Sequence, residues 1–155
     1  MAAGHEIERK FLVAALPDNV GPGVRIIQGY LPLTAGDTEL RVRRKGDHTV
    51  LTVKRGHGLD RGEQEVAISS EVFETLSPLT DGRRIEKTRY ELPHGDATIE
   101  LDEFGGELEG LLVAEIEFDS LRASEDFDEP DWLGREVTDD PGYANRALAE
   151  HGRPG

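Results

Sequence analysis

Like charges repeat two residues apart along this chain, and this spacing constrains its fold more than any other feature. Side chains of a β-strand alternate between two faces, so residues i and i+2 share a face. Apolar residues such as Leu40, Val42 and Ile116 occupy the alternate positions. The like-charged pairs are Arg41/Arg43, Glu63/Glu65, Lys87/Arg89, Glu100/Asp102 and Glu115/Glu117. The spacing therefore predicts strands with one charged face and one apolar face.

Glycine, proline and aspartate clusters separate these segments and predict turns between short antiparallel strands. Ser69 or Ser70 caps a predicted helix over about residues 71–79. Asp131–Leu133 predicts the start of a short helix, and Pro141 behind Asp139 or Asp140 predicts a C-terminal helix to about residue 149. We expect a mainly β (α+β) fold with strands over residues 5–11, 25–31, 39–44, 48–54, 63–68, 84–92, 97–104 and 111–118.

Two arrangements of the charged faces are consistent with this pattern. In a one-sided antiparallel sheet the apolar face packs on helices and the charged face meets water. In a closed sheet the charged face turns inward, where a basic sector binds a polyanion and an acidic sector binds divalent cations. The segregation of one sign of charge within each strand favours the closed sheet, because solubility requires only scattered charge.

Composition narrows the functional classes. The chain has 155 residues, enough for one domain with a sizeable core, and its formal net charge of −14 argues against a nucleic-acid binder. It contains no cysteine, so disulfides and thiolate chemistry are excluded. No apolar run approaches the roughly 20 residues of a membrane span, and the N-terminus lacks a signal-peptide pattern. We expect a cytoplasmic protein without a membrane or nucleic-acid partner.

The N-terminal segment Glu6-Ile7-Glu8-Arg9-Lys10-Phe11 resembles the Glu-x-Glu-x-Lys signature of the CYTH, or triphosphate tunnel metalloenzyme, superfamily. Nearly the whole chain is similar to its short stand-alone bacterial members. The resemblance implies a single domain over residues 1–155, folded as an eight-stranded antiparallel closed β-barrel, with helices outside the tunnel. Further segments that resemble the family are Gln28–Leu31, Glu39–Arg43, Thr52–Gly56, Lys87–Tyr90, Glu100–Asp102, Ala114–Phe118, Trp132–Thr138 and Tyr143–Asn145.

The same resemblance implies roles for the charged side chains. The expected triphosphate ligands are Lys10, Arg41, Arg43, Lys54, Lys87 and Arg89. The expected ligands of Mg²⁺ or Mn²⁺ are Glu6, Glu8, Glu115, Glu117 and Asp102, and the tunnel is also expected to hold Glu63, Glu65 and Glu100. Lys54 or Lys87, with Tyr30, is a candidate general base. The alternative is that each lysine serves only as a charge partner, because phosphate favours its protonated form.

The function implied by the resemblance is metal-dependent hydrolysis of a triphosphate. We expect inorganic tripolyphosphate, a small-molecule substrate, to be cleaved to pyrophosphate and phosphate by a monomer or homodimer. Class IV adenylate cyclase and thiamine-triphosphatase are the alternatives within the superfamily. A polyphosphate- or nucleotide-binding module without catalysis is the alternative from a different class.

Overall fold

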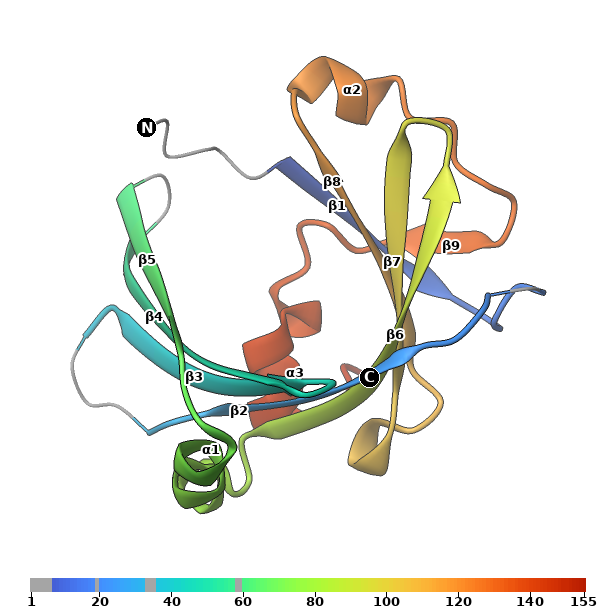
Figure 1. The fold of residues 1–155 in the computed structure, drawn as a ribbon. Coiled ribbons are helices and arrows are strands. Elements are labelled where there is room, and N and C mark those ends of the chain that lie inside the picture. Colours follow the sequence, from blue (N-terminus) through green and yellow to red (C-terminus); the bar gives the residue numbers. More distant parts are fainter. Residues whose placement is uncertain (1–6, 19, 33–35, 58–59) are drawn as a thin grey trace.

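A strongly curved antiparallel sheet dominates the computed structural model, which describes residues 7–18, 20–32, 36–57 and 60–155 (Figure 1). The mainly β class predicted from the sequence is confirmed. Nine strands are hydrogen-bonded in the order β5-β4-β3-β2-β6-β7-β8-β1-β9. Their bounds are β1 Ile7–Val13, β2 Val24–Tyr30, β3 Thr38–Lys45, β4 His48–His57, β5 Asp60–Ala67, β6 Arg84–His94, β7 Ala97–Phe104, β8 Leu112–Phe118 and β9 Leu133–Glu136.

The prediction of a closed eight-stranded barrel is wrong in two respects. The sheet is open, since β5 and β9 form its edges and no strand pairing among the described residues joins β5 to β1. The ninth strand, β9, replaces the short helix expected from Asp131. It pairs with β1 through Phe11 and Val13, and Arg9 of β1 holds Glu136 with two hydrogen bonds of 3.0 and 2.7 Å. β9 therefore occupies part of the β1 edge that closure would require.

Short helices lie on both sides of the sheet. α1 (Ser70–Leu76) and the 3₁₀ turn η1 (Ser77–Thr80) confirm the helix predicted after β5, and the Ser69 side chain accepts a hydrogen bond from the Val72 amide at its start. η2 (Gly106–Leu108) and α2 (Leu121–Glu125) flank β8. Asp140 and Pro141 begin the 3₁₀ turn η3 (Pro141–Tyr143), and the C-terminal helix α3 starts later than predicted, at Asn145–His151. None of the described helices is long and apolar enough to cross a membrane.

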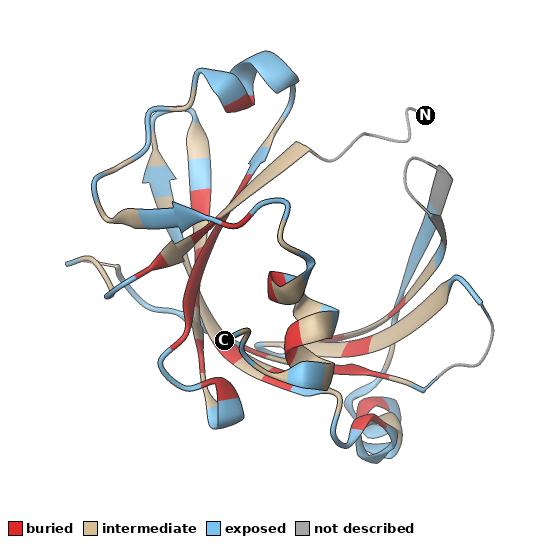
Figure 2. Cartoon of the chain, turned by 180° about the vertical axis from the view of Figure 1, so that it is seen from behind, coloured by how far each residue is buried: buried red, intermediate tan, exposed pale blue. Residues whose placement is uncertain are grey.

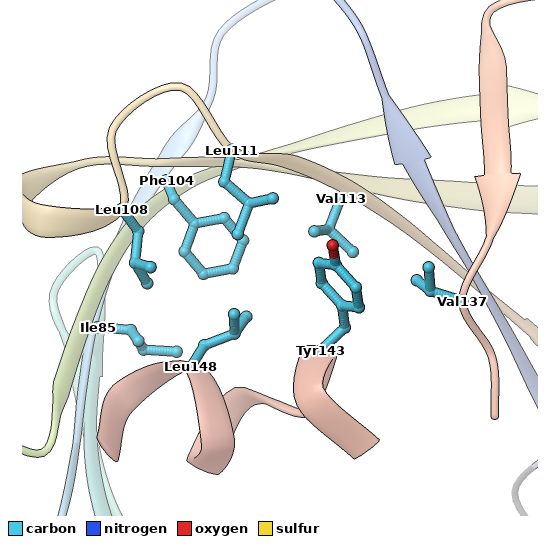
Figure 3. Close-up of a cluster of buried hydrophobic side chains, with 8 residues drawn as sticks. All are labelled: Ile85, Phe104, Leu108, Leu111, Val113, Val137, Tyr143 and Leu148. Atoms are coloured by element: carbon cyan, nitrogen blue, oxygen red, sulfur yellow. The ribbon is translucent and has the colours of Figure 1, made fainter. Parts of the chain in front are cut away.

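The C-terminal helix packs inside the curve of the sheet (Figure 1). Leu148 of α3 and Tyr143 of η3 meet inward-facing side chains of β6, β7 and β8 (Figure 3). Buried residues gather where this helix faces the sheet, whereas residues 62–67 of the edge strand β5 are exposed (Figure 2). The inner cluster consists of Ile85, Phe104, Leu108, Leu111, Val113, Val137, Tyr143 and Leu148.

A second apolar cluster covers the opposite face of β1, β7 and β8. It consists of Phe11, Val13, Ile99, Leu101, Leu112, Ala114 and Ile116, all of them buried. These residues alternate along the strands with the charged positions, as period-two patterning requires. The strands β7, β8 and β1 are therefore fixed by packing on one face, which leaves the other face to carry charge.

Gly29 allows η1 to pack directly against β2. A Cβ atom at this position would overlap the side chain of Thr80, which is fully buried in η1. The Thr80 hydroxyl donates a hydrogen bond of 2.7 Å to the Ser77 carbonyl and accepts one of 3.2 Å from Arg84 Nε. Thr80 packs on one face of β2 at Gly29, and because side chains alternate along a strand, Tyr30 points to the other face.

We predict that Gly29→Ala lowers the free energy of unfolding by about 1–3 kcal/mol, because the added methyl group forces the buried turn away from the strand. Gly62→Ala is the matched control, since Gly62 also lies in a strand and no atom lies within 4 Å of the position that its added Cβ atom would take. Urea unfolding followed by circular dichroism measures both values. Equal midpoints for the two variants would contradict the packing described for Gly29.

Candidate functional site

The strand register brings the predicted charged residues to one face of the sheet. Residues directly opposite each other on paired strands share a face, and Tyr30 lies opposite Arg41, which lies opposite Thr52 and then Glu65. Lys54 continues this face opposite Glu39 and Glu63. On the other half of the sheet the opposing pairs are Arg89/Asp102, Glu100/Glu115, Lys10/Glu115 and Glu8/Glu117. The two halves meet where β2 pairs with β6, and there Lys87 lies opposite Ile26 on the same face. We call this the inner face.

Two arginines of β3 contribute unsatisfied donors to the inner face. The Nε atoms of Arg41 and Arg43 are buried and have no hydrogen-bond partner. Burial, followed by the neighbouring positive charge of Arg41, lowers the pKa of the Arg43 guanidinium. A buried donor without an acceptor is destabilising by about 1–3 kcal/mol, so this arrangement favours the arrival of an anion.

A buried ion-pair cluster occupies the inner face on β6 and β7. Lys87 Nζ lies 2.8 Å from Asp102 Oδ2, and these residues are only 4% and 1% exposed. Arg89 donates two hydrogen bonds to the same carboxylate, from Nε to Oδ1 at 2.8 Å and from Nη2 to Oδ2 at 2.9 Å. Arg89 also lies 3.3 Å from Glu100 and 4.0 Å from Glu115. One carboxylate therefore holds two cations in place.

Opposing effects set the ionisation of this cluster. Burial alone would raise the pKa of Asp102, but the charges and hydrogen bonds of Lys87 and Arg89 outweigh it and hold that pKa below its ordinary value. Burial also lowers the pKa of the Lys87 ammonium, and the nearby positive charge of Arg89 adds to this effect. Both oxygens of Asp102 are thus occupied by cations, which favours an anchoring role over the metal-ligand role expected from the sequence.

Carboxylates form an acidic sector beside this cluster. Glu8 of β1 lies directly opposite Glu117 of β8, and Glu115 lies 3.5 Å from Lys10 Nζ. Like charges placed opposite each other are destabilising, and carboxylate oxygens suit hard divalent cations. Among the residues that the structure describes, no three carboxylate or imidazole groups already converge on one point. Glu6 lies outside the described residues.

Lys54, Glu63 and Glu65 face the opening of the sheet from β4 and β5. Lys54 Nζ lies 3.4 Å from Glu63 Oε1, and Thr52 donates a hydrogen bond of 3.4 Å to Glu65 Oε2. β5 is an exposed edge, so these two carboxylates are accessible to solvent. The charged residues predicted for these two strands therefore lie on the inner face, at the opposite end of the strand order from β8 and β1.

Sequence reasoning missed three groups that touch predicted site residues. Gln28 is 2% exposed and donates a hydrogen bond of 2.6 Å from Nε2 to the Tyr30 hydroxyl oxygen. The Asn145 side-chain oxygen accepts a hydrogen bond of 3.4 Å from Lys87, and the Tyr143 carbonyl accepts one of 3.2 Å from Lys10. The period-two spacing from Tyr30 would have identified Gln28, but the contacts of the C-terminal segment depend on tertiary packing.

A cavity of about 1190 Å³ lies beside α2 and the hairpin between β6 and β7. Glu117 of the acidic sector lines it together with Glu100, which lies opposite Glu115 on β7. Phe118 and Phe127 also line it, and their rings meet edge to face with centroids 5.4 Å apart. The acidic sector of the inner face is therefore reached from solvent on this side.

We predict that Asp102→Asn lowers the free energy of unfolding by about 3–5 kcal/mol near neutral pH, because it leaves Lys87 and Arg89 without their buried counter-ion. The folded-state pKa of Asp102 is lowered, so its charge stabilises the fold above the unfolded pKa of about 3.9. That stabilisation is lost as the pH falls, and the gap between wild type and variant should shrink below about pH 4. Chemical unfolding at several pH values measures it.

Asp126→Asn is the matched control, since Asp126 forms an exposed pair with Arg122 at 3.6 Å. We expect its unfolding midpoint to equal that of the wild type. An Asp102→Asn protein as stable as this control at pH 7 would contradict the anchoring role.

Comparison with known proteins agrees with the motifs and the geometry. A family model described as CYTH domain matches residues 4–147. The chain is 48% identical over 146 residues to an inorganic triphosphatase of Nitrosomonas europaea, covering 93% of this chain and 96% of the relative. It is 42% identical over 151 residues to an inorganic triphosphatase of Acetivibrio thermocellus, covering 96% and 95%.

A solved structure of an inorganic triphosphatase aligns with a TM-score of 0.79 at 43% identity, covering 96% of this chain and 97% of that one. These matches confirm the resemblance inferred from the sequence motifs. The chain belongs to the CYTH domain family.

Proposed function

We propose that this protein is a metal-dependent hydrolase that cleaves inorganic tripolyphosphate to pyrophosphate and phosphate on its inner face. The observation that carries the proposal is the pair of buried, unpartnered Nε donors of Arg41 and Arg43, which face the same surface as the acidic sector. An anion receptor requires only the basic residues, whereas hydrolysis of a phosphoanhydride also requires a cation site. The names of the two relatives support the choice of substrate.

The basic side chains bind and orient the triphosphate in this proposal. Arg41 and Arg43 present donors from β3, and planar guanidinium groups pair well with phosphoryl oxygens. Across the inner face, Lys10 and Arg89 add positive charge from β1 and β6, and Asp102 keeps Arg89 in position. Phosphoryl transfer depends mainly on such positioning and charge stabilisation, because the protein has little covalent chemistry to perform.

Glu8, Glu115 and Glu117, with Glu6, would hold a divalent cation. Their oxygen donors fit Mg²⁺ or Mn²⁺, and Mg²⁺ is commonly bound by one or two carboxylates together with substrate phosphates. When bound, the cation would polarise a phosphoryl oxygen and lower the pKa of a coordinated water. Phosphate oxygens of the substrate would complete the coordination, and Glu6 lies outside the described residues, among which no three such ligands converge.

Lys54 is the better placed of the two lysines proposed as a general base. Lys87 is enclosed by Asp102 and Asn145 and is 4% exposed, which suits an oriented charge partner. Lys54 has a half-buried side chain beside Glu63 at the opening of the sheet, where water can approach. Glu63 and Glu65 of β5 would lie beside Lys54 and face the attacking water.

A substrate panel tests the proposed function. Tripolyphosphate, ATP and thiamine triphosphate are each incubated with Mg²⁺, with Mn²⁺ and with a chelator, and released phosphate and cyclic AMP are measured. We expect tripolyphosphate with a divalent cation to give the highest kcat/KM and the chelator to abolish turnover. Higher kcat/KM for ATP with formation of cyclic AMP would favour a cyclase. Tight binding of tripolyphosphate without turnover under any metal would instead indicate a binding module.

We predict that Glu117→Gln raises the metal concentration needed for half-maximal activity at least 10-fold, because it removes a negatively charged oxygen donor from the acidic sector. Titration of Mg²⁺ at saturating tripolyphosphate measures this value. Glu125→Gln, in the exposed helix α2, is the control with the same change of net charge and should leave the titration unchanged. Coincident metal titrations for the two variants would remove Glu117 from the metal site.

A further inference from the structure

We propose that Gln28, by donating a hydrogen bond to the Tyr30 hydroxyl oxygen, leaves the hydroxyl hydrogen available for the substrate. The neutral phenol then donates a hydrogen bond to a phosphoryl oxygen. Gln28 is then a positioning residue that acts through Tyr30. The inference deepens the function proposed above and rests on it for the identity of the substrate. It replaces the role of general base that the sequence suggested for Tyr30.

The geometry of β2 carries this inference. Gln28 and Tyr30 lie two residues apart on the inner face, and each is only 2% exposed. The amide Nε2 of Gln28 donates to the phenol oxygen at 2.6 Å, so this oxygen acts as an acceptor. Arg41, directly opposite Tyr30 on β3, directs a positive charge at the same phenol. The phenol oxygen is therefore surrounded by donors.

The register also favours this orientation of the amide. Arg43 lies directly opposite Gln28 on β3 and has a buried Nε without a partner. With Nε2 turned to Tyr30, the amide oxygen of Gln28 is left for this donor-rich side. The reverse orientation would place an amide NH₂ group among guanidinium donors, and two donors cannot satisfy each other.

The hydroxyl hydrogen of Tyr30 is thus left to point into the site. Within the part of the chain that the structure describes, no acceptor receives a hydrogen bond from this hydroxyl. A triphosphate offers only acceptor oxygens, so the phenol and the two arginines of β3 present donors of the same kind to it. No proton transfer is assigned to Tyr30, which keeps its hydrogen throughout the reaction.

The electrostatic surroundings agree with a neutral phenol. Burial raises the pKa of Tyr30 to about 12, although Arg41 and the Gln28 hydrogen bond act in the opposite direction, and Glu39 adds to the rise. The hydroxyl therefore keeps its hydrogen from pH 6 to 10. A general base would need to lose that hydrogen within the working range of pH.

Four variants test the inference: Tyr30→Phe, Gln28→Glu, Gln28→Met and the double variant Gln28→Glu/Tyr30→Phe. A glutamate at position 28 accepts the phenol hydrogen and so turns it away from the substrate, whereas methionine only removes the amide donor. We expect Tyr30→Phe and Gln28→Glu each to lower kcat/KM for tripolyphosphate by about 10- to 100-fold, the loss typical of one hydrogen bond to a charged group. The double variant should be about as active as Gln28→Glu alone, because the glutamate has already withdrawn the phenol hydrogen and its charge effect is common to both variants, and Gln28→Met should lose less than Gln28→Glu.

The pH profile separates a donor from a base. For a neutral donor, the factor lost in Tyr30→Phe stays constant between pH 6 and 10. A loss that grows about tenfold per pH unit would identify Tyr30 as a base and overturn the inference, as would a Tyr30→Phe loss as large in the Gln28→Glu background as in the wild-type background. Circular dichroism melting confirms that each variant is folded at the assay temperature.

Binding measurements distinguish failure of this inference from failure of the proposed function. Calorimetric titration with tripolyphosphate in a chelator requires no turnover. If the wild type binds but does not hydrolyse tripolyphosphate, the proposed function fails, and weaker binding by Tyr30→Phe than by the wild type, without a further loss from Tyr30→Phe in the Gln28→Glu background, still supports the donor role. Unchanged binding in all variants, or no binding by the wild type, overturns it.

Discussion

Repulsion between like charges on one face of a curved sheet is the constraint on which the rest of this structure depends. The fold relieves it on one half of this face and leaves it on the other. On β6 and β7, Lys87 and Arg89 share the carboxylate of Asp102 in contacts of 2.8 and 2.9 Å, so both cations already have a partner. On β3, Arg41 and Arg43 keep buried Nε donors without partners. On β6 and β7 the cations of the inner face are thus held by a carboxylate, whereas on β3 an incoming anion would supply the missing hydrogen-bond acceptors.

The apolar clusters explain how such a charged face is held in shape. One cluster packs behind β1, β7 and β8, and the other joins these strands to the C-terminal helix on the inner side. The C-terminal segment also contacts the site directly, because Asn145 and the Tyr143 carbonyl accept hydrogen bonds from Lys87 and Lys10. The C-terminal segment therefore both packs against the sheet and holds two lysines of the site in position.

Period-two alternation made the inner face predictable from the sequence. The charged pairs fall on one face because strand geometry alone assigns i and i+2 to the same side. Closure of the sheet was not predictable in this way. It depends on which segment pairs with the free edge of β1, and residues 133–136 take part of that edge although Asp131 suggested a helix there.

The roles of individual residues were harder to predict for the same reason. Asp102 resembles a metal ligand in the sequence, but cross-strand pairing sets it opposite Arg89 and within reach of Lys87. Gln28 was named only within the segment Gln28–Leu31 and was given no role, which comes instead from the 2.6 Å hydrogen bond to Tyr30. Such assignments require side-chain contacts, which spacing along the chain does not specify.

Calorimetric titration of Arg43→Gln with tripolyphosphate tests the central claim most directly, namely that the inner face is the anion site. Arg55→Gln is the comparison, because Arg55 is an exposed residue on the opposite face of β4 and the change of net charge is identical. The account predicts a Kd at least 10-fold weaker for Arg43→Gln and an unchanged Kd for Arg55→Gln. Equal affinities for the two variants would contradict it.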